Sequence, residues 1–347
     1  MPCGALRAAV MGLAALLLGA CAQQRGDALV SIGADVPTTV EARDYAALYL
    51  PYATMASAAY VNKPYLNDFN CPDRARLARG GKDDADFRTS AQGWIRSLNA
   101  GGWECRFGVD ASLPCPPRAG GDKECKPVGG LHFHVWRRME GRHCREAVIA
   151  FRGTEKNDLG DWASNFRWLY RLAPKFDQYA QIKTHIKQVV ARIKQNGCPS
   201  APFATAGHSL GGGLAQQAAY ADASQSIRYV YAFDPSPVTG FFDVSALVLE
   251  KSTVGLGVDR AYERGEILAL PRLIIENFYP PAGCNPRIRT VRFNLLSGLG
   301  IAQHSISNLT KELRETAKGG GVPHRADNRL AARDCKGGPL LLMTPPA

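Results

Sequence analysis

One tight turn constrains this sequence more than any other feature. The run Gly207–Gly211, Gly-His-Ser-Leu-Gly, lies between an apolar segment at 201–206 and a helical segment at 214–220. So sharp a turn needs glycine, because side chains there would collide with the neighbouring backbone. Ser209 is thereby raised above a strand end, with the following helix N-terminus beneath it to stabilise negative charge. The pattern predicts a nucleophile elbow with Ser209 as nucleophile, rather than an ordinary glycine-rich turn.

Strand-like and helical segments alternate along the rest of the chain. Apolar or alternating runs predict strands, and apolar residues at helical spacing predict helices. The predicted strands are 131–137, 147–151, 201–206, 227–233 and 288–295, and the predicted helices are 44–60, 177–196 and 214–220. Such alternation favours a mainly parallel sheet with helices on both faces, and with the elbow it predicts the α/β-hydrolase fold.

A serine nucleophile needs a base and an orienting acid, which on this fold follow it in the order serine, acid, histidine. Only His304 and His324 come after Ser209. His324 lies among glycines near the end of the chain, whereas His304 follows the last predicted strand and precedes a helical run. We therefore predict His304 as the base, and we expect His208 to pack within the elbow.

The acid must lie at a strand end between the serine and the histidine. Asp234 ends one predicted strand, and Glu266 follows the segment 258–264. Their positions alone do not decide between them.

Three linked motifs carry a resemblance to a known family. Ala150–Thr154 reads Ala-Phe-Arg-Gly-Thr, Asp161–Phe166 contains Asp-Trp and Asn-Phe pairs, and the elbow reads Gly-His-Ser-Leu-Gly-Gly. In this order they resemble the class 3 lipases, the fungal triacylglycerol lipase group, over roughly residues 131–310. The resemblance implies hydrolysis of lipid esters through an acyl-enzyme intermediate, without a cofactor.

The same resemblance assigns further site residues. The turn Asp234–Gly240 is similar to that family's turn after the elbow helix, and the family takes its acid from the strand after it. Glu266 occupies that place and inherits the role, although the family usually has Asp; Asp234 is the alternative acid. The backbone N–H groups of Thr154 and Leu210 would form the oxyanion hole.

The N-terminus has the features of an export signal. Arg7 precedes the apolar run Ala8–Leu18, which is too short to span a bilayer. Leu18–Cys21, Leu-Gly-Ala-Cys, resembles the lipobox of bacterial lipoproteins, which implies cleavage of residues 1–20 and lipid attachment at Cys21. We expect a tether at 21–43 and a location in the bacterial cell envelope, at the outer membrane because Ala22 follows the cysteine. An ordinary signal or an uncleaved anchor is the alternative.

The remaining cysteines agree with export to an oxidising compartment. A Cys-, Pro- and Gly-rich insertion is predicted at 62–130, within a single domain at 44–347. Eight cysteines could form up to four disulfides, with the pairing open: Cys71, Cys105, Cys115, Cys125, Cys144, Cys198, Cys284 and Cys335. We predict no metal site, because no Cys-x-x-Cys or His-x-x-x-His pair occurs and His132 and His134 read as strand residues.

The charge limits the kinds of partner. The formal charge is +11, or +10 once Arg7 is removed with the signal, which favours anionic surfaces such as phospholipid headgroups. Nucleic acid is not expected, because the basic residues are scattered without an aromatic-basic motif. The predicted substrate is a lipid or other ester, and the oligomeric state stays open. Alternatives are a thioesterase, amidase or acyltransferase with the same triad, or an inactive envelope lipoprotein that binds lipids.

Overall fold

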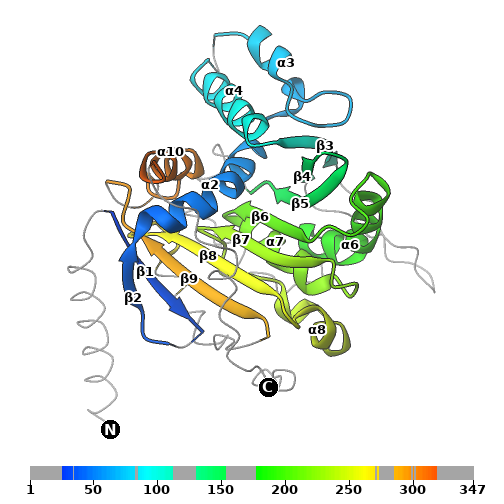
Figure 1. Ribbon diagram of the computed structural model, residues 1–347, viewed down its shortest axis with the longest axis vertical. Coiled ribbons are helices and arrows are strands. Elements are labelled where there is room, and N and C mark those ends of the chain that lie inside the picture. The colour runs from blue at the N-terminus through cyan, green and yellow to red at the C-terminus, as the bar shows by residue number, and fades with distance from the viewer. Residues whose placement is uncertain are drawn as a thin grey trace.

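The protein is described by a computed structural model that covers residues 26–33, 35–82, 85–111, 130–153, 177–269, 272, 285–297, 300 and 302–318. A nine-stranded sheet forms its centre (Figure 1). The strands are β1 (Asp27–Ile32), β2 (Thr38–Glu41), β3 (Trp103–Ala111), β4 (Leu131–Glu140), β5 (His143–Phe151), β6 (Phe203–His208), β7 (Ile227–Phe233), β8 (Gly257–Glu263) and β9 (Arg287–Phe293). Their order across the sheet is β2-β1-β9-β8-β7-β6-β5-β4-β3.

The middle of the sheet is parallel and its two margins are antiparallel. Strands β5 to β9 pair in parallel with one another, whereas β3, β4, β1 and β2 add on in antiparallel fashion. Every residue of β6 is buried, as expected of a central parallel strand covered on both faces. The carboxyl ends of β6 to β9 therefore meet at one edge of the sheet, where ligands bind in open α/β sheets.

Helices cover both faces of the sheet (Figure 1). They are α2 (Ala42–Ala58), α3 (Arg74–Arg79), α4 (Ala85–Ala100), α6 (Gln178–Gln195), α7 (Leu210–Ala221), α8 (Ala246–Ser252) and α10 (Ile306–Thr316), with short 3₁₀ turns η1 (Lys63–Tyr65) and η4 (Phe241–Asp243). One apolar core joins α6 and α7 to one face of the sheet. A second joins α2 and α10 to the other face. This layered arrangement confirms the predicted α/β-hydrolase fold.

Helix α2 is fixed to the sheet by buried polar contacts as well as by apolar packing. The Tyr49 hydroxyl donates to Asp259 Oδ2 at 3.0 Å, and Asp259 forms a buried ion pair with Arg289 on the neighbouring strand. The Tyr52 hydroxyl donates to Glu146 Oε1 at 2.8 Å. The helix is thereby tied to β8, β9 and β5, so its C-terminal end has a fixed position beside the edge where β6 ends.

The predicted tether at 21–43 is wrong for the part that the structure describes. Strand β1 pairs with β9 and with β2, so residues 27–41 extend the sheet. These strands are short, and β2 is largely exposed, which is why no hydrophobic pattern marks them. The pairing of β1 with β9 joins residues more than 250 positions apart, and such pairing leaves no local signal.

The region 62–130 contains more regular structure than the predicted loop-rich insertion. It supplies α3, α4 and the edge strand β3. A disulfide joins Cys71 to Cys105 within it, and a second joins Cys144 to Cys198. The expectation of disulfides is thus confirmed for two pairs, while Cys115, Cys125, Cys284 and Cys335 lie outside the described residues. No helix in the described part of the chain is both long and apolar enough to cross a membrane.

Candidate active site

The predicted elbow has the expected strand–turn–helix form. Strand β6 ends at His208 and α7 begins at Leu210, so Ser209 occupies the turn alone. Its φ of 58° and ψ of −125° are uncommon for a residue with a side chain. The Ser209 N–H donates to the Phe233 carbonyl at 3.0 Å, and the Ser236 N–H donates to the Ser209 carbonyl at 2.9 Å. The adjacent strand end therefore holds this strained backbone in place.

The elbow glycines are required by close contacts between backbones. A Cβ at Gly207 would lie 2.1 Å from the Gly211 carbonyl oxygen, and a Cβ at Gly211 would lie 2.4 Å from that of Phe151. A Cβ at Gly153 would lie 2.5 Å from the His208 carbonyl oxygen. The end of β5 thus lies directly against the elbow. The predicted oxyanion residue Thr154, next in sequence, lies outside the described residues.

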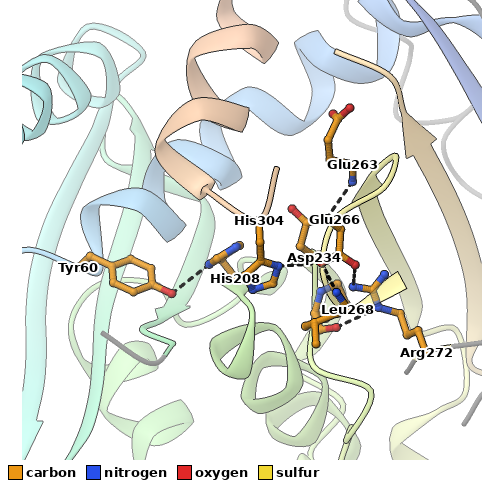
Figure 2. A network of polar contacts seen from close by, with 9 residues as sticks. Tyr60, His208, Asp234, Glu263, Glu266, Leu268, Arg272 and His304 are labelled. Atoms are coloured by element: carbon orange, nitrogen blue, oxygen red, sulfur yellow. Dashed lines mark hydrogen bonds and ion pairs between the residues drawn. The ribbon is translucent and has the colours of Figure 1, made fainter. Parts of the chain in front are cut away.

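The structure brings the predicted base and acid together. His304 lies between β9 and α10, and its Nδ1 is 2.9 Å from Oε2 of Glu266, which follows β8 (Figure 2). His304 is 3% exposed and Glu266 2%. A carboxylate bonded to Nδ1 fixes the ring and its tautomer, which directs Nε2 to proton transfer.

Both carboxylate oxygens of Glu266 accept hydrogen bonds. Besides His304, its Oε2 accepts the Leu268 N–H at 2.8 Å, and the Arg272 guanidinium donates to Oε1 in a buried ion pair. Arg272 also donates to the Pro235 carbonyl at 3.2 Å and lies over the Tyr262 ring, 4.0 Å from its centroid. Burial raises the pKa of Glu266, but Arg272 and His304 outweigh it and hold the pKa below its ordinary value. Glu266 is therefore charged at neutral pH.

The alternative acid, Asp234, has a different environment. It directly follows β7, with a φ of 39°, and is fully buried. Its Oδ1 accepts the Glu263 N–H at 2.8 Å. Burial, and next the negative charge of Glu266, raise the pKa of Asp234 well above its ordinary value. This shift favours the neutral form of Asp234. Of the two carboxyl groups, Glu266 is the one with a hydrogen bond to His304 in the described part of the chain.

Asp234 and the two histidines form a compact buried group. A ring nitrogen of His208, a ring nitrogen of His304 and a carboxylate oxygen of Asp234 lie within 4.8 Å of one another. The two imidazole rings are 4.7 Å apart between centroids. On its other side, His208 Nδ1 is 3.0 Å from the hydroxyl of Tyr60, which follows α2 (Figure 2). His208 is buried in the elbow, as predicted.

Two residues of this network were not found from the sequence. Arg272 lies six residues after the acid and stands in no motif, and Tyr60 is 148 residues from His208. For Arg272, an arginine soon after a predicted buried glutamate is a weak sequence signal. No sequence signal marks Tyr60. Leu210, predicted for the oxyanion hole, begins α7, where backbone N–H groups have no partner within the helix. Cys21 lies outside the described residues.

Comparison with known proteins gives one match in sequence families. A family model described as a phospholipase-like, Tle-like phospholipase domain matches residues 120–231, about a third of the chain, including the elbow. No curated protein sequence is significantly similar to the chain. The family match and the sheet topology confirm the predicted resemblance at the level of a lipase-like α/β hydrolase, and they support a hydrolase of lipid esters.

Several solved structures are distantly similar. Lipase II from Rhizopus niveus has 14% identity and a TM-score of 0.36, with 72% of this chain and 79% of that chain covered. The native Rhizomucor miehei lipase propeptide complex has 14% identity and a TM-score of 0.37, with 72% and 67% covered. An esterase from Pyrobaculum calidifontis has 12% identity and a TM-score of 0.34, with 71% and 97% covered.

Proposed function

We propose that the protein is a serine hydrolase that cleaves the carboxylic esters of lipids, with phospholipids as the first class to test. The observation that carries the proposal is the 2.9 Å contact between His304 Nδ1 and Glu266 Oε2, at the sheet edge where Ser209 occupies the elbow. An imidazole with one nitrogen on a charged buried carboxylate is suited to act as a base. The phospholipase-like match over residues 120–231 supports a lipid substrate.

In the proposed reaction, Ser209 Oγ attacks the carbonyl carbon of the ester while its proton passes to His304 Nε2. Glu266 stabilises the imidazolium that forms, and its pairing with Arg272 keeps it charged in its buried position. The tetrahedral intermediate breaks down to the acyl-enzyme as His304 returns the proton to the leaving alcohol. Water then attacks the acyl group with His304 again as base, which releases the fatty acid and restores Ser209.

The developing oxyanion needs hydrogen-bond donors. We assign the backbone N–H groups of Leu210 and Thr154 to this role. In support, Leu210 is the first residue of α7, and Gly153, which precedes Thr154, lies against the elbow backbone. One such donor contributes on the order of 3 kcal/mol to transition-state stabilisation.

We further propose that the enzyme acts in the bacterial cell envelope, attached to the outer membrane through lipid on Cys21. The Leu-Gly-Ala-Cys sequence that ends at Cys21 and the apolar run before it support this location. The two disulfides agree with an oxidising compartment. The anchor and the catalytic activity are separate claims, and either can fail without the other.

Labelling with a fluorophosphonate probe tests the catalytic proposal. Only an activated serine reacts readily with such a probe, so we expect one label per chain, located at Ser209 by peptide mass spectrometry. The Ser209→Ala variant should stay unlabelled while its thermal melt matches that of the wild type. A folded wild-type protein that takes up no label would refute the enzyme and favour an inactive lipid-binding lipoprotein.

A further inference from the structure

The group formed by His208, Asp234 and His304 has the composition of a metal site. Two imidazoles and one carboxylate each contribute an atom, all within 4.8 Å of one another. All three side chains are buried, and they come from three places that meet at one sheet edge: the ends of β6 and β7 and the segment before α10. The reaction proposed above uses only one of the three, His304.

Both histidines have an outer hydrogen-bond partner on Nδ1, a carboxylate for His304 and a hydroxyl for His208. His304 Nδ1 is bonded to the Glu266 carboxylate at 2.9 Å, and His208 Nδ1 is 3.0 Å from the Tyr60 hydroxyl. Metal-ligating histidines almost always place their second ring nitrogen against a carboxylate, carbonyl or water, which fixes the ring. With Nδ1 of each ring engaged in these contacts, Nε2 is the nitrogen considered as the metal ligand.

The carboxylate ligand is also held in position. Asp234 Oδ1 accepts the Glu263 N–H at 2.8 Å, whereas Oδ2 accepts no hydrogen bond among the residues that the structure describes. A buried oxygen without a partner is costly and needs an explanation. A bound cation would supply the partner, because it takes the carboxylate in its charged form.

The distances are close to those of a tetrahedral site. Ligands bound to zinc at about 2.0–2.1 Å lie about 3.4 Å from one another. The separations of at most 4.8 Å must therefore shorten by no more than about 1.4 Å. Metal binding at this site therefore requires only small movements of the three side chains.

We propose that His208, Asp234 and His304 bind one divalent transition-metal ion, such as zinc, and that the bound ion inhibits the hydrolase. Inhibition follows because the ion takes the lone pair with which His304 would accept the serine proton. This second part rests on the proposed function, whereas the binding site does not. Imidazole and carboxylate together suit zinc, copper and other transition metals, while magnesium and calcium prefer oxygen ligands alone.

Binding is measured first, with the Ser209→Ala variant of the full chain after removal of metal by a chelator. Titration with Zn²⁺ in a calorimeter, and with Co²⁺ followed by its visible absorption, should show one ion per chain. Adding His208→Gln or Asp234→Asn should weaken binding at least about tenfold, because even the loss of a second-shell partner costs about 10–100-fold. Tyr60→Phe, which removes the partner of His208, should weaken Zn²⁺ binding about tenfold. This variant still tests the site if His208→Gln and Asp234→Asn do not fold.

His143→Gln is the matched control, since His143 is an exposed histidine at the start of β5. Its affinity for Zn²⁺ should equal that of the parent. Equal affinities in the His208, Asp234 and Tyr60 variants would overturn the site. So would a Zn²⁺ affinity lost only in variants of the buried pair His132 and His134.

Inhibition is measured on the wild type with a soluble short-chain ester. Zn²⁺ should abolish hydrolysis, a chelator should restore it, and Mg²⁺ at the same concentration should have no effect. The half-inhibiting Zn²⁺ concentration should rise about tenfold in Tyr60→Phe, relative to that variant's own metal-free rate. A chain that binds one ion, and that resists fluorophosphonate when it is metal-free, would support the site while refuting the hydrolase. Labelling at Ser209 in a chain that binds no Zn²⁺ would do the reverse.

Discussion

Two buried carboxyl groups lie close to His304 and have different electrostatic surroundings. Arg272 pairs with Glu266 through Oε1, so the cost of burying that charge is offset by an opposite charge. Asp234 has the Glu263 N–H as its donor, and the negative charge of Glu266 acts against its ionisation. Because two like charges so near to each other are costly, the position of Arg272 favours the charged form of Glu266 over that of Asp234.

The first prediction separates the two acids. Glu266→Gln should lower kcat by about 10²–10⁴, because the amide can neither fix the correct tautomer nor stabilise the imidazolium. Asp234→Asn should have a much smaller effect, because the raised pKa of Asp234 favours its neutral form, which the amide resembles. Both variants are nearly isosteric, so initial rates on a soluble ester give the comparison once their thermal melts match wild type. A severe loss in Asp234→Asn with near-normal Glu266→Gln would assign the acid to Asp234.

Arg272 is the subject of the second prediction. Its removal in Arg272→Met leaves Glu266 buried without its cation, so the pKa of Glu266 rises. The charged form is then present only at higher pH, and the acidic limb of the kcat/KM profile should move upward by about one unit or more. Arg272→Lys retains a positive charge and should shift the limb less. Superimposable pH profiles for wild type and Arg272→Met would show that the ion pair does not control Glu266.

At this scale the sequence predicted the residues that have local signals. Ser209 stands in a motif, and His304 and Glu266 follow from chain order and from resemblance to a family; the structure brings the latter two into contact. Their catalytic roles remain predictions. The sequence did not predict Arg272 or Tyr60, because a partner that contributes one hydrogen bond from a distant segment needs no motif.

At the scale of elements, the elbow depends on how closely β5, β6 and α7 approach. Gly207 and Gly211 face each other across the turn, and a methyl group on either would meet backbone atoms. Backbone cannot move aside as a flexible side chain can, so such a clash must displace the helix or the strand.

The third prediction compares two glycines. Gly207→Ala should destabilise the protein by about 1–3 kcal/mol and lower hydrolysis, because its Cβ would lie 2.1 Å from the Gly211 carbonyl oxygen. Gly93→Ala is the control within α4, where a Cβ meets nothing within 4 Å. It should stabilise by about 0.5–1 kcal/mol, since alanine favours a helix. Urea unfolding followed by circular dichroism measures both, and a neutral Gly207→Ala would contradict the close approach.

The fourth prediction concerns the connection between β8 and the segment after β9. Glu263 ends β8, and its Oε1 accepts the N–H groups of Leu295 and Leu296 at 2.9 and 3.1 Å. Burial raises the pKa of Glu263 to about 7, above the 4.5 of an exposed Glu. The folded state therefore binds more protons between pH 4.5 and 7, and stability falls as pH rises through that window.

Replacing the acid by its amide removes this dependence. Glu263→Gln can still accept through its carbonyl oxygen, and it carries no charge to bury. At pH 8 the variant should be more stable than wild type, by on the order of 2–3 kcal/mol at most, while at pH 4.5 the two should be similar. Thermal melts at both pH values measure the difference. A variant that is less stable at pH 8 would show that the charged form is favoured in the folded protein.

Elements with strong hydrophobic periodicity were predicted close to their observed bounds. The predicted helix at 177–196 is α6 (Gln178–Gln195), and the predicted strand at 227–233 is β7. The strands β1 and β2 were missed, because these six- and four-residue segments gain their stability from pairing, β1 with β9 and β2 with β1. The cysteine pairs were open for the same reason, since pairing depends on which distant segments the fold brings together.

At the scale of the whole molecule, the strand that follows the proposed anchor in sequence pairs with the strand that precedes the candidate active-site histidine. Strand β1 begins at Asp27, only a few residues after Cys21. It pairs with β9, whose following segment carries His304. A lipid on Cys21 would therefore hold the catalytic sheet close to a membrane surface, and the net charge of +10 of the chain without residues 1–20 would favour anionic headgroups there.

The last prediction concerns this lipid attachment, in the protein purified from the bacterium that naturally produces it. The mature chain should begin at Cys21 and carry at least two acyl chains, because firm anchoring requires more than one. In a detergent phase-separation experiment it should then partition into the detergent phase, while Cys21→Ala should remain in the aqueous phase or keep its uncleaved N-terminus. Mass spectrometry of the N-terminal peptide identifies the acyl groups directly. An unmodified N-terminus on a protein that stays in the aqueous phase would refute the anchor, and hydrolysis of esters by that same soluble protein would show that catalysis does not depend on it.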